Sequence, residues 1–242
     1  MKRRALIIGN SGNNNNPKEY LEGVKKDVAN YHKFLKSNIG GNWYEQEIIL
    51  SLDETKKQVI NKIEKIKNEN PDLLFVLFSG HGSYSKLYEC RKLYLFDEHI
   101  YEKDLTYITD KQVTILDTCA GIEDDLILDS ITMMESKASF EDYKTPKNYR
   151  ILYQNAVMQC PSQQVVLYSS SIDESSQDDS ELGGYFAYNL LKVAQNNKQE
   201  ILNSKEAYFY AKKIVQEKTK KEQNPQCSCI KSEKILPFSI GE

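Results

Sequence analysis

Residues 73–82 have the sequence LLFVLFSGHG, in which an unbroken apolar run of strand length ends in small residues and His81. Residues 112–121, QVTILDTCAG, follow the same plan and end in Cys119 and two small residues. Continuous apolar runs of this length are typical of parallel strands that are buried on both faces, and ligands bind beyond the carboxyl ends of such strands. If these two strands are neighbours, an imidazole and a thiol meet at one edge of the sheet.

Strand-like and helix-like patterns alternate along the rest of the chain, which predicts a mainly parallel sheet with helices on both faces. Further strands are expected at 4–9, 48–50 and 164–170, helices at about 18–37, 59–66, 184–196 and 204–221, a hairpin or extension at 87–96, and a short helix at 102–108. Residues 120–160 show no clear periodicity. A stretch of this length inside a compact domain is usually functional or disordered.

A length of 242 residues suits one α/β domain with a substantial core. The net charge of −3 provides no basic surface for nucleic acid, and no apolar run approaches the roughly 20 residues that span a bilayer. The five cysteines are odd in number and lack the spacing of a disulfide framework. The apolar run after the basic residues 2–4 is too short for an export signal, so we expect a cytoplasmic protein without nucleic-acid or membrane partners.

His81 and Cys119 together suggest nucleophilic catalysis by a thiolate. A free cysteine has a pKa near 8.5, and a neighbouring imidazolium lowers that value and supplies a proton to a leaving amine. We therefore assign Cys119 as the nucleophile and His81 as the general acid and base. Each residue alone has a plainer interpretation, a buried structural thiol and a histidine that caps a turn. Their places at the ends of two matched strands favour catalysis.

The SGHG and DTCAG segments resemble those of caspase-like cysteine peptidases, and most of all the metacaspases, orthocaspases and paracaspases. The resemblance extends from residues 5–10 and 21–28 to 236–239. It implies a caspase-like three-layer αβα sandwich, an α/β fold with a mainly parallel six-stranded sheet. It also implies a single peptidase domain over 1–242, with a large-subunit-like part at 1–119, a linker at 120–160 and a small-subunit-like part at 161–242. The backbone N–H groups of Gly82 and Cys119 would then form the oxyanion hole.

Asp117 is the main departure from true caspases, which carry Gln-Ala-Cys where this chain has Asp117-Thr118-Cys119. Strand alternation places the side chains of Asp117 and Cys119 on the same face. A buried carboxylate is costly unless a cation pairs with it. If the substrate supplies that cation, the pocket selects Arg or Lys before the scissile bond.

Two further carboxylates match acidic pocket residues of the resembling families, Asp27 in the first helix and Asp178 after the strand at 164–170. Asp173 and Glu174 compete with Asp178 for the third place, because this loop is acidic throughout. An aspartate-directed pocket would instead need arginines to clamp the substrate carboxylate. Arginine is scarce, with only Arg3, Arg4, Arg91 and Arg150 in the chain.

The sequence thus favours a cysteine endopeptidase that cuts after Arg or Lys through a thioester acyl-enzyme, with a protein or peptide as its substrate. The alternatives are an inactive or weakly active binding or scaffold module in a signalling complex, and transpeptidation by the same dyad. Resembling enzymes are zymogens that cleave their own linker, and the matching sites here are Lys137, Lys144, Lys147 and Arg150.

Some relatives also need calcium or a recruiting or activating protein. The acidic residues 123–125 lack an EF-hand pattern, and Cys227 and Cys229 form only half of a metal site. We therefore predict no cofactor and no metal site.

Overall fold

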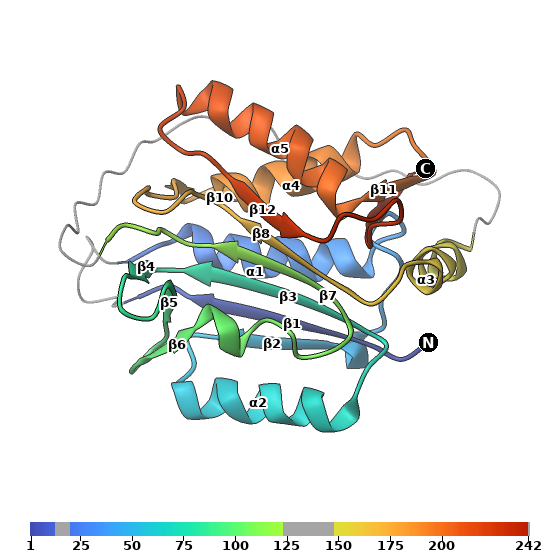
Figure 1. Ribbon diagram of the computed structural model, residues 1–242, viewed down its shortest axis with the longest axis horizontal. Helices are drawn as coiled ribbons and strands as arrows, with labels where there is room; N and C mark the ends of the chain where they lie inside the picture. Colours follow the sequence, from blue (N-terminus) through green and yellow to red (C-terminus); the bar gives the residue numbers. More distant parts are fainter. Residues whose placement is uncertain (13–19, 123–147, 242) are drawn as a thin grey trace.

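A six-stranded sheet lies at the centre of the computed structural model, which describes residues 1–12, 20–122 and 148–241 (Figure 1). Its strands, in spatial order, are β12 (Gln226–Cys229), β8 (Gln163–Tyr168), β7 (Lys111–Asp117), β3 (Leu73–Gly80), β1 (Arg3–Asn10) and β2 (Ile48–Leu52). All neighbours pair in parallel except β12, which runs antiparallel to β8 at one edge. The predicted α/β fold with a mainly parallel six-stranded sheet is confirmed.

The helices and smaller sheets surround this central sheet. The helices are α1 (Gly23–Lys36), α2 (Lys56–Glu69), α3 (Tyr149–Gln159), α4 (Tyr185–Gln195) and α5 (Ser204–Lys218), with 3-10 turns η1 (Glu45–Glu47) and η2 (Glu102–Asp104). A three-stranded sheet comprises β4 (Gly82–Ser85), β5 (Cys90–Tyr94) and β6 (His99–Tyr101). Two-stranded ladders join β9 (Asp178–Asp179) to β10 (Gly183–Gly184), and β11 (Ile201–Asn203) to β13 (Pro237–Ile240).

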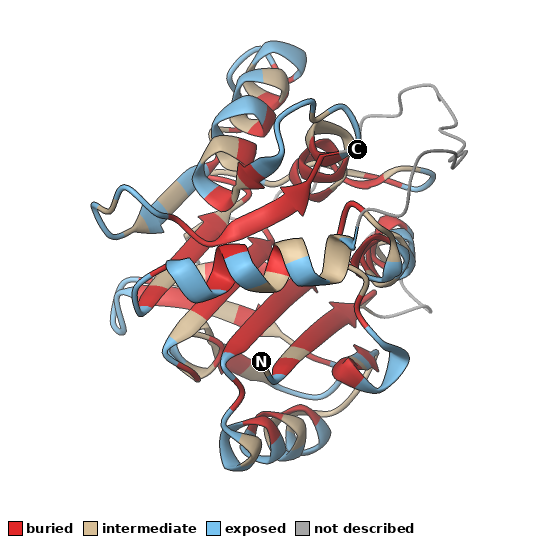
Figure 2. Cartoon of the chain, turned by 90° about the vertical axis from the view of Figure 1, so that its right-hand side faces the viewer, coloured by how far each residue is buried: buried red, intermediate tan, exposed pale blue. Residues whose placement is uncertain are grey.

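Two hydrophobic cores form, one on each face of the sheet, because successive strand residues point to opposite faces. In β1, Ala5 and Ile7 face the core beneath α1, α3, α4 and α5, whereas Leu6 and Ile8 face the core beneath α2 and the three-stranded sheet. Every residue of β3 is buried. Figure 2 shows the same pattern, with buried strands inside and helices exposed only on their outer sides. The strand that precedes His81 is therefore anchored on both faces.

Helix α3, strand β12 and the short strands β6, β9, β10, β11 and β13 were not predicted. Helix α3 lies in the stretch without clear periodicity, and only Tyr153, Ala156 and Val157 are buried in it, while Ile151 and Met158 are exposed. A helix with apolar residues on both sides gives a weak periodic signal. Strand β12 was missed because its sequence, QCSC, is short and carries none of the β-branched residues that usually mark a strand.

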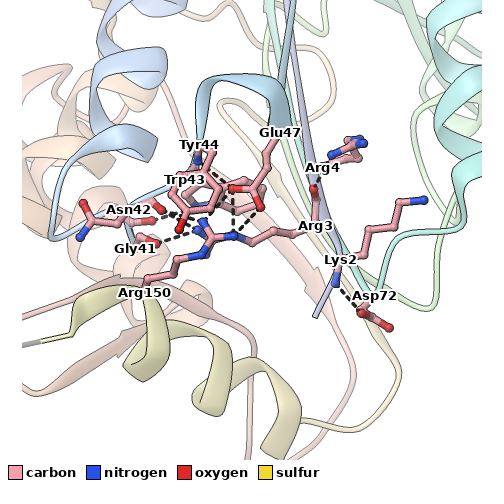
Figure 3. A network of polar contacts seen from close by, with 11 residues as sticks. Lys2, Arg3, Arg4, Gly41, Asn42, Trp43, Tyr44, Glu47, Asp72 and Arg150 are labelled. Atoms are coloured by element: carbon pink, nitrogen blue, oxygen red, sulfur yellow. Dashed lines mark hydrogen bonds and ion pairs between the residues drawn. The ribbon is translucent and has the colours of Figure 1, made fainter.

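A buried ion network joins α3 to the N-terminal part of the fold (Figure 3). The Arg3 side chain is fully buried, lies 4.5 Å from the centre of the Trp43 ring, and donates to Glu47. Arg150, from α3, donates to both carboxylate oxygens of Glu47 and to the Asn42 carbonyl. Burial raises the pKa of Glu47, but its hydrogen bonds and the two arginines outweigh that effect and the pKa lies below its ordinary value.

Arg150, one of the predicted self-cleavage sites, is a member of this network. The side chain of Arg150 is only 18% exposed and lies in a helix, whereas a peptide that a protease binds as an added strand must be extended. Arg150 is therefore not an exposed cleavage site in this structure. Lys137, Lys144 and Lys147 lie outside the described residues.

Replacing Glu47 with alanine is expected to lower the free energy of unfolding by about 3 kcal/mol, because the buried charge of Arg3 then loses its counter-charge. Urea unfolding measures the change. Glu45→Ala is the matched control, since Glu45 is exposed and pairs with Lys36 at the surface, where such pairs contribute little. An equal loss in both variants would mean that the buried network does not stabilise the fold.

Candidate active site

His81 and Cys119 lie at the same edge of the sheet, as the sequence predicted. Strands β3 and β7 are parallel neighbours, and their last paired residues are Ser79 and Asp117. His81 and Cys119 each follow two residues later, so they occupy equivalent positions beyond the carboxyl ends of adjacent strands. Both residues are partly exposed. The backbone of His81 is held by the three-stranded sheet, because Tyr94 N–H donates to its carbonyl at 3.0 Å.

The sulfur of Cys119 contacts the backbone of Ser176. The Ser176 N–H donates to Sγ at 3.3 Å, and the thiol donates to the Ser176 carbonyl at 3.6 Å. Burial raises the pKa of Cys119, and the Ser176 N–H and the charge of Arg91 act in the lowering direction while Asp117 raises it further. Because the net shift is upward, the thiol is protonated at neutral pH, and a base must take its proton before it can attack.

Gly82 is packed directly against the nucleophile segment. A Cβ placed on this glycine would collide with Thr118 Oγ1 and would lie 3.2 Å from the Cys119 carbonyl oxygen. The two residues predicted to form an oxyanion hole are thus in adjacent segments. Only a glycine lets these backbones approach so closely.

Asp27, Asp117 and Asp178 come together from three elements and form what we call the acidic cluster. Asp27 lies in α1, Asp117 ends β7, and Asp178 begins β9. Asp27 accepts from Ser79 Oγ at 2.7 Å, and Asp117 accepts from Ser176 Oγ at 2.7 Å. Ser176 therefore contacts both the nucleophile and the acidic cluster.

Two helix N-termini supply backbone donors to the acidic cluster. At the start of α4, Gly184 N–H donates to Asp27 at 3.0 and 3.1 Å, and Ala187 N–H donates to Asp117 at 2.8 Å. At the start of α1, Gly23 N–H donates to Asp178 at 3.2 Å. The first N–H groups of a helix have no intrahelical partner and carry partial positive charge, so they stabilise carboxylates.

Glycines also set the shape of the acidic cluster. A Cβ would collide with Asp178 at Gly23, with Asp27 at Gly183 and with Asp117 at Gly184. Gly183 also has a φ of 96°, which favours glycine. The Gly-Gly-Tyr-Phe segment at 183–186 thus serves both the fold and the cluster, because Phe186 is fully buried in the core and the two glycines lie against the carboxylates.

The carboxylates of the acidic cluster are easier to protonate than free aspartates. Burial, and then the charge of Asp117, raise the pKa of Asp27 well above its ordinary value, and the same two causes raise the pKa of Asp178 to about 7. Burial also raises the pKa of Asp117. Among the described residues, no Lys or Arg forms an ion pair with any of the three. The negative charge of the ionised carboxylates is therefore not neutralised by a side chain of the described residues. A cation that bound in the cluster would pair with this charge.

Asp173 and Glu174, the competitors of Asp178, have other partners. Asp173 is exposed in a turn, and its N–H donates to the Ala120 carbonyl. The Glu174 carboxylate accepts from the Ser171 N–H and from the backbone and side chain of Asn224. Of the three candidates, Asp178 is the one whose charge raises the pKa of Asp27.

The sequence pattern missed two polar residues that position the loop over Cys119. Gln223 is fully buried, donates from Nε2 to Ser169 O and to Ser176 Oγ, and accepts from Gln177 N–H. Ser176 makes the contacts to Cys119 described above. Neither residue belongs to a periodic run or a motif, because both are brought to the site by loops. Ser79, which donates to Asp27, did lie within the SGHG segment.

Two further sequence predictions concern metals and membranes. Residues 123–125 lie outside the described residues. Cys227 and Cys229 are partly buried neighbours on β12, and within 1–12, 20–122 and 148–241 no group of three or more metal-ligating side chains is placed to hold an ion. None of the described helices has the length and apolar character needed to span a membrane.

The carboxyl edge of the central sheet thus carries a thiol and an imidazole, the two side-chain types that thiolate catalysis uses. The family model of the caspase domain matches residues 2–236, so this chain belongs to the caspase domain family, a family of cysteine peptidases. The crystal structure of caspase-1 from Spodoptera frugiperda has a similar fold, with a TM-score of 0.65 and 15% sequence identity, over 94% of this chain and 88% of that one. No curated protein sequence matches the chain.

Proposed function

We propose that this protein is a cysteine endopeptidase that cleaves peptide bonds after Arg or Lys, with Cys119 as nucleophile and His81 as general acid and base. The proposed preference for Arg or Lys is based on one observation. Three carboxylates lie together beside Cys119, and no cationic side chain of the described residues pairs with them. Such an arrangement is costly in a protein unless a cation arrives from outside.

In this proposal the two side chains act in the following order. His81 accepts the proton of the Cys119 thiol, and the thiolate attacks the carbonyl carbon of the scissile bond, so that a carbon–sulfur bond forms. The N–H groups of Gly82 and Cys119 stabilise the oxyanion. The C–N bond then breaks as His81 returns the proton to the leaving amine. Water, deprotonated by His81, attacks the remaining thioester and releases the acid product and the free thiol.

The ligand of the acidic cluster is an organic cation in this proposal. The three carboxylates are each engaged by backbone N–H or serine O–H donors, and they are not placed to hold a metal ion. Guanidinium and ammonium groups bring their own hydrogen-bond donors, which suit carboxylate oxygens. A long basic side chain before the scissile bond fits these requirements.

Regulation by cleavage of the 120–160 linker, by calcium or by an activating protein is also part of the proposal. A zymogen is consistent with the Ser176 backbone contacts to the Cys119 sulfur, because they cover part of a side chain that is only partly exposed.

The first experiment compares wild-type and Cys119→Ala proteins on fluorogenic peptides that end in Arg, Lys, Asp or Leu, each with and without calcium. We expect hydrolysis of the Arg and Lys peptides by the wild type alone. Cleavage after Leu or Asp would refute the role of the acidic cluster while keeping the nucleophile. Cleavage by both proteins would refute Cys119. Silence with every peptide would favour a binding or scaffold module, unless cleavage of the linker by trypsin, followed by complete inhibition of the trypsin, restores activity.

A further inference from the structure

Arg91 is a buried cation that the proposed mechanism does not use. It lies on β5 and is 3% exposed. Its Nη2 donates to the Ser170 carbonyl at 2.6 Å, and its guanidinium carbon lies 4.7 Å from the centre of the Tyr168 ring. The carboxylate of Glu102 is 4.0 Å from its Nε. Its Nη1 is buried and has no hydrogen-bond partner among the described residues.

The contacts of Arg91 place it beneath the nucleophile segment. Ser170, which accepts from Arg91, donates from Oγ to the carbonyl of Thr118, the residue before Cys119. On the other side, Arg91 pairs across the ladder with Tyr84, whose N–H donates to the carbonyl of Gly121. Arg91 is thus linked to the backbone on both sides of Cys119.

The charges around the thiol explain why a fixed cation matters here. The negative charge of Asp117, on β7, disfavours the thiolate form of Cys119, whereas the positive charge of Arg91, on β5, favours it. His81 lies beyond the end of the neighbouring strand β3. The groups that face Arg91 itself are Glu102 from η2, Tyr168 from β8 and Tyr84 from β4. Glu102 offsets part of the guanidinium charge.

We propose that Arg91 is a positioning residue that holds the Ser170 carbonyl against the nucleophile segment and stabilises the anionic form of Cys119 with its buried charge. This inference rests on the proposed role of Cys119 as the nucleophile. It assigns a direct part in the reactivity of the thiol to β5 of the three-stranded sheet, whose β4 begins at Gly82.

A purely structural role explains the arrangement less well. Burying a guanidinium with an unpaired Nη1 costs free energy, and an apolar side chain of similar size would fill the same space without that cost. The charge is therefore the property to test, separately from the volume.

The test measures the rate of Cys119 alkylation by iodoacetamide from pH 6 to 11.5, a range that extends above the raised pKa of the thiol, in a His81→Ala background so that the imidazole does not titrate. Peptide mass spectrometry separates Cys119 from Cys90, Cys160, Cys227 and Cys229. We expect Arg91→Gln to raise the midpoint of the profile by roughly one pH unit. Arg91→Lys keeps the charge and should shift it by less than half as much. Glu102→Gln removes the offsetting charge and should lower the midpoint.

An unchanged midpoint in Arg91→Gln, or equal shifts in the Gln and Lys variants, would overturn the proposal. If Arg91→Gln does not fold, the Glu102→Gln shift decides, and an upward shift or none would refute the role of the charge. Alkylation reports on the thiol itself, so the midpoint is obtained whether or not the protein cleaves peptides. Failure of this inference is thereby distinguishable from failure of the proposed function.

Discussion

Replacing His81 with alanine should reduce kcat for an arginine peptide by about 10⁴-fold, with little change in KM. The thiol of Cys119 has a raised pKa in this structure, so without a base only a small fraction of it is thiolate. The loss of His81 also removes the acid that protonates the leaving amine. Steady-state kinetics on the peptide measure the effect.

His32→Ala is the matched control, because His32 lies on α1 and pairs with Glu45 at the surface, outside the carboxyl edge of the sheet. It should retain wild-type kcat. The double variant of His81 and Cys119 should be no slower than the worse single variant, because residues that act as a unit are not additive. An equal loss in the two histidine variants would contradict the assignment of His81.

Replacing Asp178 with asparagine should lower kcat/KM for an arginine peptide by about 100-fold, which corresponds to about 2.7 kcal/mol, in the range found when one member of a buried charge pair is removed. Asp178 is the best member of the acidic cluster to replace, because among the described residues its carboxylate accepts a single hydrogen bond, from the backbone N–H of Gly23. Asp27 and Asp117 each accept from a serine as well as from α4, so their replacement would also disturb the fold. Asp173→Asn is the control in the same loop, and asparagine tolerates its positive φ.

The pH dependence of the same variant provides a second measurement. The pKa of Asp178 is raised to about 7, so in the free protein this carboxyl loses its proton near neutral pH. An arginine substrate binds the ionised form, and KM should therefore rise as the pH falls below 7. In Asp178→Asn this dependence should weaken. A KM that is equally pH-dependent in both proteins would assign the titration to another group.

Stability should change in the opposite direction from activity. A carboxyl whose pKa is higher in the folded state than in the unfolded state binds more protons when folded, so its contribution is present below pH 4 and is lost as the pH rises to about 7. At pH 8 the Asp178→Asn protein should thus be more stable, by on the order of 2 kcal/mol after allowance for solvent. Urea unfolding at pH 5 and pH 8 tests this expectation.

The fold was predictable from sequence because its strands are unusually continuous. The run that ends in His81 is apolar up to Ser79, and the run that ends in Cys119 has only Thr114 among the apolar residues of 113–116. Two such runs in a parallel sheet bring their ends to one edge. Asp117 and Cys119 were placed on one face by strand alternation alone. The gathering of Asp27 and Asp178 around Asp117 was anticipated through the family resemblance, and the structure shows which donors surround them.

The rest of the site escaped prediction because loops determine it. Ser176 and Gln223 are distant in sequence and meet over Cys119 only through the folded chain, and neither has a local pattern. The sequence gives no sign of a role for Arg91, because its position beneath the nucleophile segment depends on the pairing of β4 with β5. Helix α3 lacked a periodic signal because its exposed side is partly apolar.

The glycines at 23, 183 and 184 restrict how the specificity of this protein can diverge. Each carboxylate of the acidic cluster lies against one of them without room for a further methyl group. A descendant that preferred acidic substrates would need arginines in place of aspartates, and the longer arginine side chain would have to be placed against glycines where even a Cβ collides with the present carboxylate. Point substitutions within the cluster would therefore produce inactive intermediates before they produced a new preference. A change of specificity in this lineage would require the β9–β10 turn to be rebuilt as a unit, for example by an insertion or deletion.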